Sequence, residues 1–127
     1  MPKILIVDDE EFNRDILRTR LEGSGFVVLD LAGGEEVVQT AKSARPDLIL
    51  LDVMMPRING WKVCELLKAD PQTAGVPVVM LTACVQQIDE LRSWESGASG
   101  YITKPWDTAQ LLETINGLLP LRAKSLA

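Results

Sequence analysis

Five polar side chains follow closely on apolar segments of this sequence, at points where the strands of a sheet would end: Asp8, Asp9, Asp52, Thr82 and Lys104. Asp52 is the most informative of them, because it comes directly after the apolar run at 48–51 and before a turn at 53–60. If the strands lie parallel in one sheet, their carboxyl ends meet at a single edge. The sequence therefore predicts a site that combines three carboxylates, a hydroxyl and an amine.

These residue types favour a divalent cation and a phosphoryl group. Three neighbouring carboxylates repel one another, and a cation offsets that repulsion. The chain has no histidine, which excludes imidazole metal sites and Ser-His-Asp triads; oxygen ligands favour Mg²⁺, with Mn²⁺ possible. The metal and Lys104 would offset charge on phosphoryl oxygens, and Thr82 would donate a hydrogen bond to them. Asp52 could then act as a nucleophile and form an acyl phosphate.

A structural explanation exists for two of the three aspartates taken alone. Asp9 could cap the helix that begins before Phe12, and Asp52 could stabilise a turn. These explanations fit a single aspartate better than three that lie with a hydroxyl and an amine on adjacent strands. The two cysteines, Cys64 and Cys84, share no metal-type spacing and are too few for a disulfide scaffold. We interpret them as packing or loop residues, with a redox role for Cys84 as the alternative.

The composition is typical of a single globular domain. The chain has 127 residues, 46% hydrophobic and 24% charged, which suffices for one core. Its net charge of -5 argues against direct nucleic-acid binding, which needs clustered Lys and Arg. No apolar stretch approaches the roughly 18 to 20 residues of a membrane span. Because the first three residues lead directly into a strand, no signal peptide is expected and the predicted location is the cytoplasm.

Apolar runs alternate with segments of helical spacing along the whole chain. The runs predict strands at 3–7, 26–31, 48–51, 77–81 and 100–103. The intervening pattern predicts helices at 12–23, 34–44, 60–69, 86–97 and 107–119. Strands without in-out alternation are buried on both faces, so the expected fold is a doubly wound α/β three-layer sandwich around a five-stranded parallel sheet. Phe12, Leu66 and Leu91 are among the residues expected to face the core.

Four motifs at the predicted strand ends resemble those of response-regulator receiver domains of two-component signalling. They are Val7-Asp8-Asp9-Glu10, Leu50-Leu51-Asp52-Val53-Met54-Met55-Pro56 with Gly60, Leu81-Thr82-Ala83, and Tyr101-Ile102-Thr103-Lys104-Pro105. Each motif is weak alone, but their order along the chain is specific. The resemblance covers a receiver domain at 1–120, leaves a short C-terminal tail at 121–127, and implies a flavodoxin-like (βα)5 fold with strand order 2-1-3-4-5.

The resemblance also implies roles for the acidic residues. Asp52 corresponds to the phosphoacceptor of the family. Asp8 and Asp9 correspond to the acidic pair that binds Mg²⁺ together with Asp52. The backbone carbonyl of Met54 corresponds to a further metal ligand.

Further roles follow for residues near the last two strands. Thr82 and Lys104 correspond to the phosphate-sensing hydroxyl and amine. Tyr101 matches the aromatic switch residue that changes rotamer when the loop after Thr82 moves, although it could instead be a half-buried anchor of the last strand. The Lys104-Pro105 bond is a candidate cis peptide.

The expected partners are proteins. Since the chain has no histidine, its phosphate must come from a histidine kinase or a histidine phosphotransfer protein, with small phosphodonors as a substitute. In the family, the face made by the fourth helix, the fifth strand and the fifth helix, here called the output face, serves dimerisation or docking of an effector or output domain. Tyr101, Trp94 and Trp106 are expected there, with covering the rim of the core as the alternative for the tryptophans.

Two other classes of protein compete with this interpretation. A haloacid-dehalogenase-type hydrolase would need an Asp-x-Asp spacing, whereas Asp8 and Asp9 are adjacent. A degenerate receiver that serves only as a protein-interaction module would lack Asp52 or Lys104, and both are present. We therefore expect a switch that catalyses only its own phosphorylation and dephosphorylation. Met54 and Cys84 cannot orient an attacking water, which predicts that dephosphorylation is slow.

Overall fold

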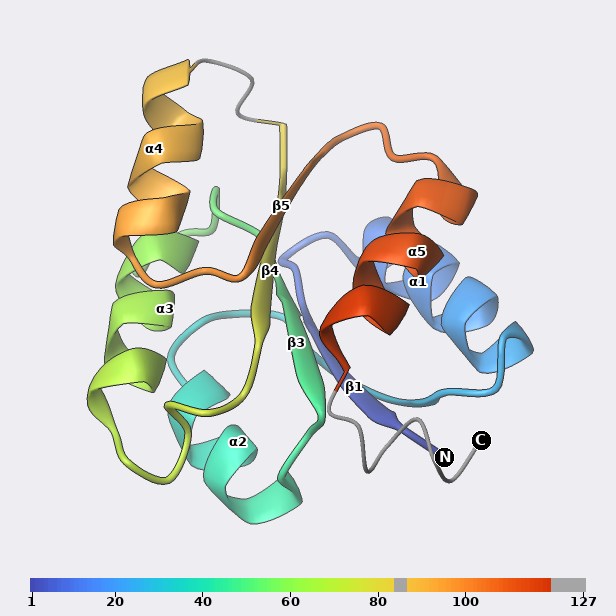
Figure 1. Cartoon of the computed structure of the whole chain (residues 1–127), viewed down its shortest axis with the longest axis horizontal. Coiled ribbons are helices and arrows are strands. Elements are labelled where there is room, and N and C mark those ends of the chain that lie inside the picture. The colour runs from blue at the N-terminus through green and yellow to red at the C-terminus, as the bar shows by residue number, and fades with distance from the viewer. Residues whose placement is uncertain (84–86, 120–127) are drawn as a thin grey trace.

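Strands and helices alternate through residues 1–83 and 87–119, the part of the chain that this computed structural model describes (Figure 1). The strands in this part are β1 (Lys3–Val7), β2 (Val27–Leu31), β3 (Leu48–Leu51), β4 (Val78–Thr82) and β5 (Gly100–Thr103). The helices are α1 (Glu11–Gly23), α2 (Val37–Ala44), α3 (Gly60–Ala69), α4 (Gln87–Glu95) and α5 (Thr108–Leu118). Cys84 and the predicted tail at 121–127 lie outside the described residues.

The strands form one parallel sheet in the order β2-β1-β3-β4-β5, which confirms the predicted doubly wound α/β fold. Helices α1 and α5 cover one face of the sheet, and α2, α3 and α4 cover the other (Figure 1). The register pairs Val7 with Leu51 and Thr82 with Thr103. The carboxyl ends of β1 and β3 therefore lie level with each other, and β4 and β5 extend two residues further at the same edge of the sheet.

Two apolar clusters fill the space on either side of the sheet. Successive strand residues contribute to opposite clusters: Ile4 and Ile6 pack with α1 and α5, whereas Leu5 and Val7 pack with α2 and α3. Both sets are essentially inaccessible to solvent. Burial on two faces explains why these strands have continuous apolar sequences.

Three side chains that were expected in the core lie at the surface instead. The exposed fraction is 73% for Phe12, 41% for Leu66 and 49% for Leu91. Phe12 precedes the buried Leu17 by five residues, which rotates it about 140° around α1, away from the sheet.

The helices and strands start and end within two residues of the predicted positions, except that α2 begins at Val37 rather than at 34. Within the described ranges, no helix combines the length and the apolar character needed to cross a bilayer.

Candidate functional site

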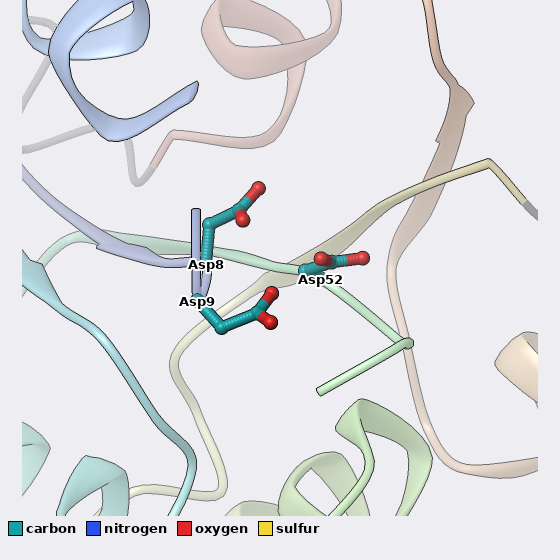
Figure 2. Close-up of side chains that lie close together, drawn as sticks. All are labelled: Asp8, Asp9 and Asp52. Carbon is teal, nitrogen blue, oxygen red and sulfur yellow. The ribbon is translucent and has the colours of Figure 1, made fainter. Parts of the chain in front are cut away.

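The three aspartates meet at the carboxyl edge of the sheet. Asp8 and Asp9 follow β1, and Asp52 follows the adjacent strand β3 (Figure 2). One carboxylate oxygen from each residue lies within 4.8 Å of the others. Asp8 and Asp52 are only 1% and 4% exposed, whereas Asp9 is exposed. The cluster therefore combines two buried carboxylates with one that reaches the surface.

Asp8 is hydrogen-bonded at each of its polar groups. Its backbone N–H donates to Leu31 O at 3.2 Å, and its carbonyl accepts from the guanidinium of Arg14 at 2.8 Å. Its Oδ1 accepts from the backbone N–H of Glu10 at 2.9 Å. The residue that caps α1 is Glu10, without a side-chain hydrogen bond, so Asp9 does not serve as the helix cap that was considered as an alternative.

Asp52 is fixed by the turn that follows β3. Its backbone N–H donates to Val7 O at 2.9 Å, and its Oδ1 accepts from the N–H of Met54 at 3.3 Å. Gly60, the first residue of α3, packs against the other side of this turn: a Cβ there would lie 2.2 Å from the carbonyl oxygen of Asp52. Asp52 therefore does stabilise a turn. Its other carboxylate oxygen, Oδ2, points toward Lys104.

Lys104 brings the last strand into the cluster. Its Nζ lies 2.9 Å from Asp8 Oδ2 and 3.4 Å from Asp52 Oδ2. Its backbone N–H donates to Thr82 O at 2.8 Å, which ties the ends of β4 and β5 together. Thr82 itself is fully buried. The Lys104–Pro105 peptide bond is cis, as expected from the sequence.

The charges at this edge perturb one another. Burial raises the pKa of Asp52 to about 6, the nearby Lys104 ammonium opposes that rise, and the charge of Asp8 adds to it. Burial would lower the pKa of Lys104, but its bonds to Asp8 and the charges of both aspartates outweigh burial, so the pKa of the ammonium lies above its usual value. The single amine thus offsets part of the repulsion between two buried carboxylates.

The donor set fits a hard divalent cation. Three carboxylate oxygens within 4.8 Å of one another are close to the spacing around one Mg²⁺ ion, whose ligand distances are about 2.1 Å. All the candidate ligands are oxygens, and Asp9 leaves the cluster accessible from solvent. Met54 lies in the turn after Asp52 and is 64% exposed. The edge can therefore hold a cation and, beside it, a group whose negative charge Lys104 would offset.

The three aromatic residues expected on the output face are not brought together. Trp94 lies on α4 and is 44% exposed. Tyr101 is partly buried against the cluster on the α2–α3 side of the sheet. Trp106 precedes α5 and packs against the cluster on the other side, where it borders a hollow of about 490 Å³ together with Ile16 and Arg20 of α1. Trp106 therefore lies beside α1 rather than beside Tyr101 as expected.

Two contacts near the site had no counterpart in the sequence reasoning. Arg14 binds the carbonyl of Asp8, and Trp61 binds Ser93 of α4 through its indole N–H at 2.9 Å. Neither pair belongs to a motif, and both depend on where a helix lies relative to the sheet. The position of Gly60 at the start of a predicted helix was a usable signal for close backbone packing.

Known proteins match this chain over most of its length. A model of the response regulator receiver domain matches residues 4–116. The DNA-binding dual master transcriptional regulator RpaA of Synechocystis sp. is 40% identical over 119 residues, which cover 94% of this chain and 49% of RpaA. The alkaline phosphatase synthesis transcriptional regulatory protein PhoP of Bacillus subtilis is 39% identical over 92% of this chain and 48% of PhoP. The chain thus spans about half the length of these relatives.

Solved structures agree with this match. The chemotaxis protein CheY4 of Vibrio cholerae superposes with a TM-score of 0.88 and 31% identity, covering 94% of this chain and 99% of CheY4. The signal receiver domain of a signal transduction histidine kinase from Syntrophus aciditrophicus has a TM-score of 0.87 and 36% identity, covering 94% of this chain and 90% of that one. Fold, sequence and the acidic edge of the sheet agree, and the chain belongs to the family of response regulator receiver domains of two-component signalling.

Proposed function

We propose that Asp52 is the phosphoacceptor of this receiver domain. Receiver domains of response regulators are phosphorylated by a kinase on an aspartate. The observation that supports Asp52 in this role is its position: it is a buried carboxylate at the end of β3, the central strand, between the acidic pair that follows β1 and Thr82 at the end of β4, and its Oδ2 lies 3.4 Å from the amine of Lys104. At neutral pH, above its pKa of about 6, the carboxylate is mostly ionised and able to act as a nucleophile.

The proposed reaction is an in-line transfer. An oxygen of Asp52 forms a bond to phosphorus while the bond from phosphorus to a histidine nitrogen of the donor breaks, and the electron pair of that bond leaves with the imidazole. Lys104 offsets the negative charge of the phosphoryl oxygens, and the hydroxyl of Thr82 donates a hydrogen bond to one of them. Histidine kinases or histidine phosphotransfer proteins are the proposed donors, since the chain itself has no histidine.

A divalent cation completes the proposed site. Asp8, Asp9 and Asp52, with the carbonyl of Met54, would hold Mg²⁺, and Mn²⁺ could replace it. When bound, the cation supplies positive charge to the phosphoryl oxygens. The grouping of the three carboxylates supports this assignment. We further propose that the domain turns over no other substrate and acts as a switch.

The output of the switch is proposed to pass through α4, β5 and α5. Phosphorylation would shift Thr82 and change the rotamer of Tyr101. Tyr101 is partly buried on the face of the sheet that α2, α3 and α4 cover. Trp94 and Leu91 give this face exposed apolar area for a partner, an output domain or a second copy of the chain. Cytoplasmic location and the lack of direct nucleic-acid binding by this domain stay predictions from the sequence.

Intact-mass analysis tests the phosphoacceptor. Wild type and Asp52→Asn are incubated with acetyl phosphate and Mg²⁺, and we expect the mass of one phosphoryl group on wild type alone. Exposed Asp15→Asn, on the outer side of α1, is the matched control and should be labelled like wild type. A gain in both wild type and Asp52→Asn would move the acceptor elsewhere. No gain in wild type would favour the alternative of a receiver-like interaction module that is not phosphorylated.

A further inference from the structure

Helix α4 is attached to the rest of the domain by a polar contact. Among the α4 side chains that the structure describes, residues 90–95, Ser93 is the one that is buried, with an exposed fraction of 0%. The apolar side chains Leu91 and Trp94 of the same helix are 49% and 44% exposed. This part of α4 therefore does not rest on an apolar side chain of its own, as a packed surface helix ordinarily does.

The partner of Ser93 is a tryptophan on the neighbouring helix. The indole N–H of Trp61 in α3 donates a buried hydrogen bond to Ser93 Oγ at 2.9 Å. Arg92 of α4 lies over the same ring, with its guanidinium carbon 4.0 Å from the ring centre. Both helices lie in the same layer over the sheet (Figure 1). One side chain of α3 thus makes a directional bond and a cation–π contact to consecutive residues of α4.

Trp61 is also joined to Asp52 through the backbone. The preceding residue, Gly60, lies so close to the carbonyl of Asp52 that a Cβ would approach it to 2.2 Å. Its N–H donates to Val53 O at 2.9 Å. The turn that carries Asp52 and the first residues of α3 therefore move together, because no free space separates them.

We propose that Trp61 is a positioning residue that transmits the state of Asp52 to α4, by a route through α3 that is separate from Thr82 and Tyr101. The inference depends on the proposed phosphorylation of Asp52. A change in the turn at 52–60 shifts Trp61, and the bond to Ser93 carries that shift into the helix that presents Leu91 and Trp94. A polar bond suits this role because its geometry is specific and it can break and re-form.

The test separates phosphorylation from the response of α4. Wild type, Trp61→Phe, Ser93→Ala and the double variant are phosphorylated with acetyl phosphate and Mg²⁺, and intact mass gives the phosphorylated fraction. Amide hydrogen exchange of peptides that contain α4 is then compared with and without phosphate, at equal phosphorylated fraction. Trp61→Phe keeps an aromatic ring but removes the N–H donor together with part of the indole, whereas Ser93→Ala removes the acceptor with little change of volume. Thermal unfolding checks that each variant remains folded.

We expect phosphorylation to change exchange in α4 of wild type. Each single variant should reduce that change about threefold or more, the equilibrium effect of one ordinary hydrogen bond. The double variant should be no worse than either single one, because both remove the same bond. Ser43→Ala is the matched control for Ser93→Ala: it removes an exposed hydroxyl that donates to Thr40 O on its own helix, α2, and should leave the α4 response unchanged.

Three results would overturn the inference while leaving the proposed phosphorylation of Asp52 intact. In the first, α4 responds in Trp61→Phe and Ser93→Ala as strongly as in wild type. In the second, the effects of the two substitutions add in the double variant. In the third, wild type is phosphorylated but the hydrogen exchange of its α4 does not change. Absence of a phosphoryl mass gain in wild type is a different result, because it overturns the proposed function and this inference with it.

Discussion

At Asp52, burial and a neighbouring acid act against ionisation, which raises the pKa of this carboxyl to about 6. The pKa in the folded state lies above 3.8, the usual value for an aspartate, so the folded protein binds the proton more tightly than the unfolded chain does. By linkage, the stability that the protonated group contributes is complete below about pH 4 and is lost as the pH rises through about 6. Ionisation of Asp52, which its role as a nucleophile requires, thus lowers the free energy of unfolding.

The raised pKa of Asp52 predicts a pH-dependent effect of Asp52→Asn. In a metal-chelating buffer, the variant should melt at a higher temperature than wild type at about pH 7.5, and the difference should shrink at about pH 5, where wild type is largely protonated. Circular dichroism melts at the two pH values measure it. Asp15→Asn, at an exposed position, serves as the control. A gain of the same size at both pH values would show that charge at Asp52 is not the cause.

Met54 carries a second prediction at this scale. It lies two residues after Asp52 and is 64% exposed, so it flanks the proposed phosphoryl group without an atom that could orient a water. We expect Met54→Asn to speed loss of the phosphoryl group by roughly tenfold, less than a full general base gives, because an amide can orient water but does not take its proton. The decay of the phosphorylated mass after removal of the donor gives the rate. Met54→Leu should lose the phosphoryl group as slowly as wild type. Slower loss from Met54→Asn than from wild type would refute this prediction.

The residues of the site were predictable to different degrees. Asp8, Asp52 and Lys104 each follow a strand and Thr82 ends one, and parallel strands place their carboxyl ends at one edge whatever the details of packing. The contact of Arg14 with the carbonyl of Asp8 was not predictable in this way. It depends on the rotation and height of a helix, which the spacing of apolar residues leaves undetermined.

At the scale of elements, the junction between β3 and α3 is the tightest feature of the site. Gly60 begins α3 with its Cα against the backbone of Asp52, and a Cβ would lie 2.2 Å from that carbonyl oxygen and 2.9 Å from Val53 Cα. Because the obstructing atoms are backbone, they cannot rotate away as a side chain could. The turn at 52–60 and α3 must therefore shift together to admit any side chain here.

Gly60→Ala should accordingly destabilise the domain by about 1–3 kcal/mol, the usual cost of overpacking. It should also slow labelling of Asp52 by acetyl phosphate, since the turn carries that residue. Gly117→Ala in α5 is the matched control: nothing lies within 4 Å of its added Cβ, and replacing a helical glycine should stabilise by up to about 1 kcal/mol. Urea unfolding of both variants measures the difference. Equal effects of the two substitutions would contradict the packing argument.

The strands were predicted more accurately than the helix faces, for a physical reason. β3 at Leu48–Leu51 and β5 at Gly100–Thr103 have the predicted bounds, because a run buried on both faces is apolar at every position. A helix is buried along one stripe only, and its sequence does not fix the width of that stripe. Leu66 lies next to the buried Leu67, Phe12 lies on the side of α1 that faces away from the sheet, and both are exposed.

At the scale of the whole molecule, the two-layer covering of the sheet separates two tasks. The carboxyl edge gathers the charged groups, while α4, on the same side of the sheet as α3, exposes Leu91 and Trp94 to a partner (Figure 1). Trp106 and α1 border a separate hollow on the other side, next to Lys104. A donor and an effector could therefore approach the domain on different faces, with the acidic edge between them.

Mg²⁺ should stabilise the whole domain, because its ligands come from separate strands and exist as a site only in the folded state. At about ten times its Kd, a ligand bound only by the folded protein adds about 1.4 kcal/mol, which is roughly 5 °C in the melting temperature of a domain of this size. Thermal melts with MgCl₂, against NaCl at equal ionic strength, measure this shift. Asp9→Asn should abolish most of it while leaving the metal-free melting temperature nearly unchanged, because Asp9 is exposed. If the melting temperature of Asp9→Asn rises as much as that of wild type, Asp9 is not a ligand of the metal. If NaCl raises the melting temperature as much as MgCl₂ does, the effect is only screening of the acidic cluster.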